Sequence, residues 1–142
     1  MYHKDDTFEG MIGGNKMKVN AKSIDLAKVQ AEAEESYRKG FFCCEAVMEV
    51  IMDNFELDVP HEIIKMASGM AIGVGKSGCI CGALNGGVLA ISMFFGRDEQ
   101  RGPKDPEVVK CMSMTNELHD WFRENNTKKA ACCRVLTREF DM

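Results

Sequence analysis

No Cys-x-x-Cys motif occurs in this sequence, although it contains seven cysteines in 142 residues. The thioredoxin-type redox motif, the paired zinc-knuckle spacing and the Cys-x-x-Cys-His haem attachment motif are therefore absent. The count is odd, and a reducing compartment keeps thiols reduced, so a structural disulfide framework is not expected. We expect the cysteines to be redox groups, metal ligands or small buried side chains.

The sequence also lacks a long hydrophobic run and an excess of basic residues. The longest apolar stretch, residues 88–95, is far shorter than the roughly 20 residues that cross a bilayer, and the first twenty residues contain no apolar segment. The net charge is -4, which gives no basic surface for phosphates. We therefore expect a cytoplasmic protein with no membrane insertion and no nucleic-acid partner.

The apolar residues recur at helical spacing, and no stretch alternates as a half-buried strand would. Residues 1–20 show no apolar period and are expected to form a loosely ordered N-terminal arm, followed by one all-helical domain over residues 21–142. The predicted fold is all-α: a single-domain bundle of five or six helices, with a Gly-rich loop before a central buried helix. The helices are expected to begin near Ser23, Cys44, Pro60, Cys79, Asp105 and Lys128.

Two motifs in the Gly-rich loop resemble phosphate-binding signatures. Gly73, Gly75 and Gly78 fit G-x-G-x-x-G, with Asp98 about 20 residues further on. Gly69 lies one residue too far from Gly75-Lys76-Ser77 for a P-loop. Both motifs need a strand–turn–helix unit in a parallel sheet, which this sequence does not predict, so we assign the glycines to the shape of the loop.

Cysteines at predicted helix starts are the strongest candidates for chemistry. Cys44 and Cys81 fall in first turns, where free amides and the helix dipole favour a thiolate. Cys133 also lies near a helix start, whereas Cys111 lies mid-helix on an apolar face and is expected to pack. Gly82 and Gly86 lie four residues apart, so a neighbouring backbone could approach the central helix closely. A second subunit could share this helix, and we expect a homodimer.

Three segments, in order, resemble a known family, the redox-active proteins named for the pattern C_GCAxxG_C_C. Residues 42–47, FCCEAV, look like its first cysteine segment, with Cys44 in the cysteine position and Cys43 where Asn is common. Residues 81–86, CGALNG, match its CGAxxG signature, and residues 133–137, CRVLT, look like its CRxLT-like segment. The resemblance covers most of the chain from about residue 23 and implies thiol redox activity.

The sequence departs from the family pattern near its end, where members usually carry a further cysteine. Either that last element is missing, or another cysteine stands in for it. The candidates for this role are Cys79, Cys111 and Cys132.

Three functions fit the cysteines. The first is a cytoplasmic thiol–disulfide oxidoreductase with a redox partner that the sequence does not identify; Cys44 and Cys81 form the reversible pair, Cys133 resolves it, and Cys79 is in reserve. The second is a soft-metal or iron–sulfur protein that uses the same four cysteines as ligands. The third is a helical interaction domain whose cysteines only pack in the core.

Overall fold

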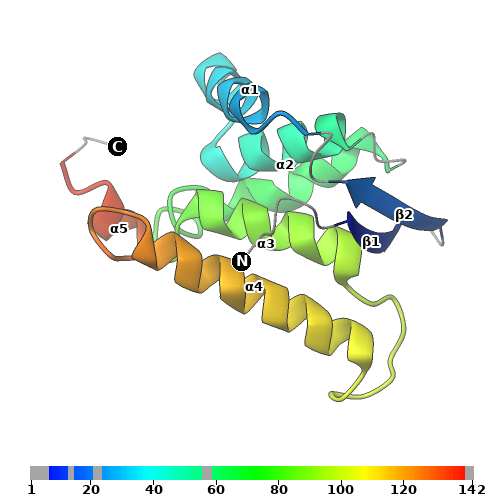
Figure 1. Cartoon of the computed structure of the whole chain (residues 1–142). Coiled ribbons are helices and arrows are strands. Elements are labelled where there is room, and N and C mark those ends of the chain that lie inside the picture. The colour runs from blue at the N-terminus through cyan, green and yellow to red at the C-terminus, as the bar shows by residue number, and fades with distance from the viewer. Residues whose placement is uncertain (1–6, 13–14, 21–23, 56–58, 140–142) are drawn as a thin grey trace.

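The computed structural model describes residues 7–12, 15–20, 24–55 and 59–139 of the chain. A hairpin of two strands precedes the helices in the chain. In Figure 1 the hairpin lies at the right of the view and the last helix lies at the left. The elements are β1 (Thr7–Ile12), β2 (Asn15–Asn20), α1 (Leu26–Lys39), α2 (Cys43–Asn54), the 3-10 helix η2 (His61–Met70), α3 (Gly82–Phe95), α4 (Pro106–Glu124) and α5 (Cys133–Leu136).

The all-α bundle predicted from the sequence is confirmed, with six helical segments in the described part of the chain. Within residues 1–20, for which the sequence predicts a loosely ordered arm, the structure describes two strands. There β1 and β2 pair antiparallel, from Thr7 opposite Asn20 to Ile12 opposite Asn15, and β1 packs against α3. The hairpin is stabilised by the pairing of its two backbones and by the contact of β1 with α3. Neither interaction requires a regular spacing of apolar residues in the sequence.

Side-chain caps fix where two of the helices begin. Asp25 caps α1 by accepting a hydrogen bond from the Lys28 amide at 3.2 Å, while the predicted cap, Ser23, lies outside the described residues. Asp105 caps α4 by accepting a hydrogen bond from the Glu107 amide. Pro106 follows it as the first residue of the helix, as the sequence predicts. The Asp105 side chain is buried and forms an ion pair with Arg101 at 2.6 Å. Burial alone would raise the pKa of Asp105, but these partners hold it below its usual value.

Two predicted helices begin later than the sequence suggests. Residues 79–81 are not helical, so the central helix starts at Gly82 instead of near Cys79. The last helix covers only residues 133–136 instead of about 128–138. Here Asn126 forms side-chain hydrogen bonds with both the amide and the carbonyl of Ala130, which holds the segment in a turn.

Helix α3 is the centre of the bundle, because it packs on α2, α4 and η2. Its glycines allow the close approach that the sequence predicts: a Cβ atom added at Gly86 would lie 2.8 Å from the Cys44 carbonyl oxygen and 3.0 Å from Val47 Cβ. Met48 and Ala90 belong to the buried cluster where α2 meets α3. The distance between α2 and α3 is therefore set by the absence of side chains on one face of α3.

Gly86→Ala is expected to lower the free energy of unfolding by about 1–3 kcal/mol, because its methyl group meets backbone that cannot move aside without disturbing α2. Urea unfolding followed by circular dichroism under reducing conditions measures the change. Gly69→Ala is the matched control, since a Cβ atom at Gly69 has no neighbour within 4 Å. Equal effects of the two substitutions would contradict the proposed role of this contact.

Candidate thiol site

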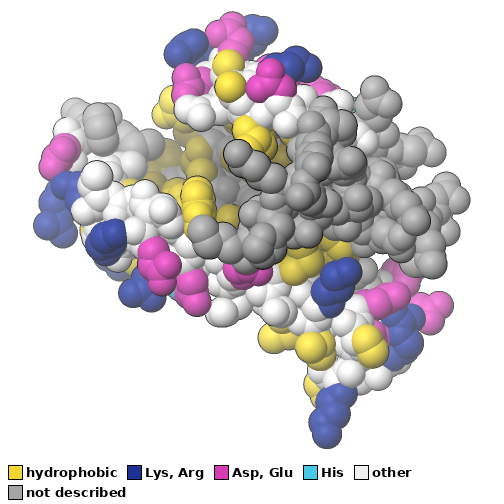
Figure 2. Space-filling model, viewed as in Figure 1, with side chains coloured by type: hydrophobic (Ala, Val, Ile, Leu, Met, Phe, Trp, Pro, Cys, Tyr) yellow, Lys and Arg dark blue, Asp and Glu magenta, His cyan; other side chains and the backbone are white. Residues whose placement is uncertain are grey.

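Six of the seven cysteines lie at or just before the starts of three helices. Cys43 and Cys44 open α2, Cys79 and Cys81 precede α3, and Cys132 and Cys133 open α5. In Figure 1 these helix starts lie on the same side of the molecule, at the left of the view. Figure 2 shows hydrophobic side chains in a recess on this side, between α1 and α5.

Backbone hydrogen bonds join the segment before α3 to the segment that opens α5. The Cys81 amide donates to the Ala131 carbonyl at 2.7 Å, and the Arg134 amide donates to the Gly78 carbonyl at 3.1 Å. The Arg134 side chain also covers Gly78, where an added Cβ atom would lie 2.9 Å from Arg134 Cβ. The cysteines of these two distant segments are therefore held next to one another.

Cys43 is the cysteine of α2 that faces the start of α3. Its Sγ atom would lie 2.5 Å from a Cβ atom added at Gly82. Cys44 is completely buried, and its Sγ–H donates to the Ala67 carbonyl of η2 at 3.1 Å. The sequence prediction placed Cys44 in the site and Cys43 beside it. In the structure Cys44 lies on the core stripe that packs α2 against η2, and Cys43 is the one that faces α3.

Burial raises the pKa of both thiols on α2. It is the largest influence on Cys43, and the like charges that Cys44, Cys81 and Cys133 carry when ionised raise the value further, to about 11. Burial also raises the pKa of Cys44. The prediction that a helix start favours the thiolate of Cys44 was therefore wrong, because the loss of solvation outweighs the field of the helix end. The ionised forms of Cys81 and Cys133 act on Cys43 only as minor contributions beside its burial.

Cys79 and Cys132 form a second, more exposed pair. Their Sγ atoms lie 3.0 Å apart, although 53 residues separate them in the sequence. The hydrogen bond with Cys132 raises the pKa of Cys79, and the nearby positive charge of Arg134 opposes this rise. No disulfide links the described cysteines, but this is the contact from which one could form with the least movement of the chain.

A left-handed turn carries the chain into this pair. Residues 72–76 all have positive φ, between 53° and 66°, including the β-branched Ile72 and Val74. Such residues rarely adopt this conformation, which costs roughly 1–2 kcal/mol each. The turn is held by the Cys79 amide, which donates to the Gly73 carbonyl at 3.2 Å, and by the Gly78 amide, which donates to the Ile72 carbonyl at 3.2 Å. The strained loop thus fixes the position of Cys79.

Of the four cysteines predicted as site residues, Cys81, Cys133 and Cys79 lie where α3 and α5 begin, and Cys44 lies in the core. Cys111 is buried among Phe94 and Phe95 and contacts the Ser92 hydroxyl at 3.7 Å, as expected for a packing residue. The sequence prediction did not include Cys43 as a site residue and offered Cys132 only as a stand-in for the family's last cysteine. The sequence does carry a signal for Cys132. A residue just before a helix has an extended backbone, so its side chain points in a different direction from that of the next residue, and Cys132 can make contacts that Cys133 does not.

The metal hypothesis requires at least three ligating side chains around one point. In the ranges that the structure describes, no three His, Cys, Asp or Glu side chains are grouped in this way. The described residues therefore do not form the required ligand set, and no step of the proposed chemistry involves a metal ion or a cluster. Of the described helices, none is long and apolar enough to cross a membrane.

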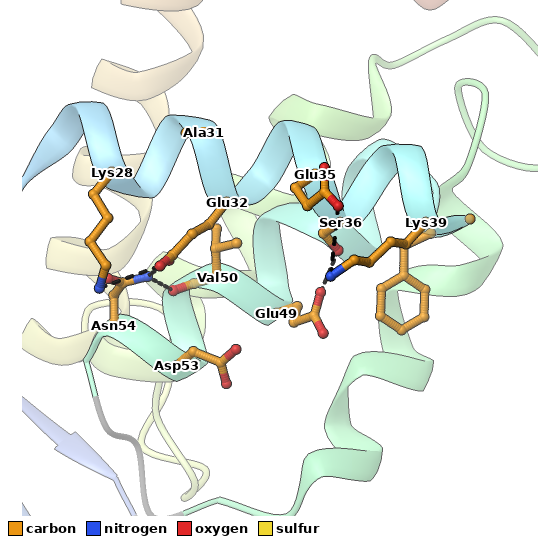
Figure 3. A pocket seen from close by; sticks show the side chains of 12 residues that line it. Lys28, Ala31, Glu32, Glu35, Ser36, Lys39, Glu49, Val50, Asp53 and Asn54 are labelled. Atoms are coloured by element: carbon orange, nitrogen blue, oxygen red, sulfur yellow. Dashed lines mark hydrogen bonds and ion pairs between the residues drawn. The ribbon is translucent and has the colours of Figure 1, made fainter.

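A groove of about 770 Å³ lies between α1 and α2, away from the thiols (Figure 3). Its acidic side chains have partners on the same two helices: Asn54 donates to Glu32 at 2.7 Å, and Ser36 donates to Glu49. Lys39 pairs with Glu35 at 3.8 Å, another of the contacts drawn in Figure 3. These contacts link α1 to α2 across the groove, so we assign the groove to the packing of the two helices.

Comparison with known proteins agrees with the cysteine pattern. The family model described as "Putative redox-active protein (C_GCAxxG_C_C)" matches residues 41–142, which include the starts of α2, α3 and α5. No curated protein and no solved structure matches the chain significantly.

Cys132→Ala is expected to make Cys79 more reactive at pH 8, although it removes a neighbouring thiol. The hydrogen bond with Cys132 keeps the pKa of Cys79 raised, so its loss moves that pKa down and increases the reactive thiolate at a given pH. The initial rate of alkylation by iodoacetamide between pH 7 and 11, assigned by peptide mass spectrometry, gives the profile. Cys111→Ala should leave it unchanged; an unchanged profile in Cys132→Ala would contradict the contact.

Gly73→Ala and Gly75→Ala distinguish two effects on Cys79: a direct displacement of its backbone, and the added strain of a side chain in the left-handed turn. Both glycines have positive φ, but only a Cβ atom at Gly73 meets the backbone of Gly78 and Cys79, whereas Gly75 has open space. We expect Gly73→Ala to move Cys79 away from Cys132 and shift its alkylation profile to lower pH. Gly75→Ala should keep the wild-type profile, and the same shift in both variants would refute the link between Gly73 and Cys79.

Proposed function

Because this chain belongs to the C_GCAxxG_C_C family of redox-active proteins, we propose that it is a thiol–disulfide redox protein whose centre is formed by Cys43, Cys81 and Cys133. The observation that supports the proposal is that the chain segments carrying these three cysteines are held against one another at the starts of α2, α3 and α5. Cys43 lies against Gly82, the residue after Cys81, and backbone hydrogen bonds join the segment of Cys81 to that of Cys133. Cysteines that served only as packing would have no need to meet at three helix starts.

The proposed chemistry is thiol–disulfide exchange, with Cys81 as the attacking residue. Its thiolate attacks one sulfur of an incoming disulfide and displaces the first thiol, which leaves a mixed disulfide. The thiolate of Cys43 or Cys133 then attacks the Cys81 sulfur, releases the second thiol and closes an internal disulfide. Two electrons pass to the incoming disulfide, whose two sulfurs leave as thiols with the protons lost by the protein.

Cys81 suits the attacking role because it combines access with a helix start. It is partly exposed and lies at the N-cap of α3, whereas Cys133 is only 5% exposed. The raised pKa of Cys43 favours its protonated form at neutral pH, so it suits the resolving role better than the attacking one. The proposal includes a reducing location such as the cytoplasm, where the dithiol would be regenerated.

The decisive experiment equilibrates the protein, without oxygen, in mixtures of reduced and oxidised dithiothreitol and counts free thiols by labelling and mass spectrometry. Cys79→Ser and Cys132→Ser are introduced together, so that only the three cysteines of the proposed centre, Cys44 and Cys111 remain. We expect two thiols to be lost reversibly as the mixture becomes more oxidising. Further substitution of Cys81→Ser should keep all remaining thiols free.

Cys111→Ser, in the same background, is the matched control and should not alter the two-thiol change. A constant thiol count over the whole range would refute the proposed function. A disulfide formed through Cys111 would also refute it, because that residue lies outside the centre.

A further inference from the structure

We propose that Cys79 and Cys132 form a surface dithiol through which the inner thiols exchange electrons with external thiols and disulfides. This inference rests on the proposed function and adds the route of access to it. It assigns a role to two cysteines that occupy none of the family positions recognised in the sequence. Three observations carry it: the contact between the two sulfurs, the exposure of Cys79, and the connection of both residues to the inner cysteines.

The sulfur–sulfur distance of 3.0 Å is close to what disulfide formation requires. A disulfide has a length of about 2.05 Å, so the two atoms need to approach by only about 1 Å. The backbone already holds the two segments together through the bonds from Cys81 to Ala131 and from Arg134 to Gly78. A disulfide between Cys79 and Cys132 can therefore form by adjustment of the two side chains, without rearrangement of the helices.

Cys79 is more exposed than the thiols of the proposed centre. It is exposed, whereas Cys43, Cys81 and Cys132 are partly exposed and Cys133 is buried. A sulfur atom of another molecule must reach its target in line with the disulfide bond, so access limits the rate of exchange. Arg134 is also exposed and acts on Cys79, which favours an anionic partner such as glutathione disulfide.

The outer pair is linked to the inner centre through both of its members. Cys79 is two residues from Cys81, and Cys132 directly precedes Cys133. The two segments pair along their backbones, so each outer cysteine lies beside an inner one on the same short piece of chain. An exchange between the pairs therefore needs only local movement.

The steps balance as two successive exchanges. In the first, the two outer thiols reduce an external disulfide to two thiols and become the Cys79–Cys132 disulfide. In the second, the Cys81 thiolate attacks this disulfide, and an inner thiolate from Cys43 or Cys133 resolves the product. The outer cysteines leave as thiols, the inner pair is oxidised, and no other oxidant is required.

The test is a time course in which the fully reduced protein is mixed with glutathione disulfide, quenched with acid and mapped by mass spectrometry. We expect the Cys79–Cys132 disulfide to form first and the inner disulfide to follow it. In Cys79→Ser and in Cys132→Ser, the inner disulfide should form at least about tenfold more slowly. Cys111→Ser should behave as the wild type, and circular dichroism checks that each variant is folded.

Two outcomes overturn the inference while the proposed function stands. One is an inner disulfide that forms at the wild-type rate in both outer-cysteine variants. The other is an inner disulfide that forms before the outer one in the wild type. The proposed function fails separately, in the dithiothreitol equilibrium, where the outer cysteines have been removed and only the inner thiols are counted.

Discussion

The close approach of α2 and α3 is the constraint on which the thiol site depends. At Gly82 and Gly86 the start of α3 lies so near α2 that any side chain would meet Cys43, the backbone of Cys44 or Val47. This approach places Cys43 against the residue that follows Cys81, and it buries Cys44 between α2 and η2. Gly82 and Gly86, the glycines of the family signature, therefore allow α2 to approach α3 closely enough for Cys43 to contact the start of α3.

Burial and the helix end act in opposite directions on these thiols, and burial dominates on α2. Free amides at a helix start favour a thiolate by a modest amount, while the loss of water around a buried sulfur disfavours it strongly. Because the pKa of Cys43 is about 11 and that of Cys44 is also raised, both stay protonated at neutral pH. In the proposed redox centre, exchange therefore begins at a more accessible thiol. Cys81 and the outer pair are the thiols placed for that step.

The sequence was sufficient for most of the fold and for the identity of the cysteine segments, because both depend on local patterns. Helical spacing and the pair of Asp105 and Pro106 predicted α4 at its observed start, and Gly86 predicted the close packing of α3. The hairpin was missed because strand pairing is a contact between segments. The sequence prediction favoured Cys44 over Cys43 without knowledge of such a contact: both lie on one turn of α2, and only the position of α3 decides which of them faces the start of that helix.

The contact between Cys79 and Cys132 depends on two segments of the chain, and neither segment predicts it alone. The segment before α3 and the segment that opens α5 each carry one cysteine at a family position, Cys81 and Cys133, and one extra cysteine nearby. Since hydrogen bonds hold the two segments side by side, the extra cysteines meet as well. A left-handed turn that contains β-branched residues is strained. Its carbonyl groups accept hydrogen bonds from the amides of Gly78 and Cys79, and these bonds hold the strained turn in place. The turn and the paired segments together hold Cys79 where a partner molecule and Cys132 can both reach it.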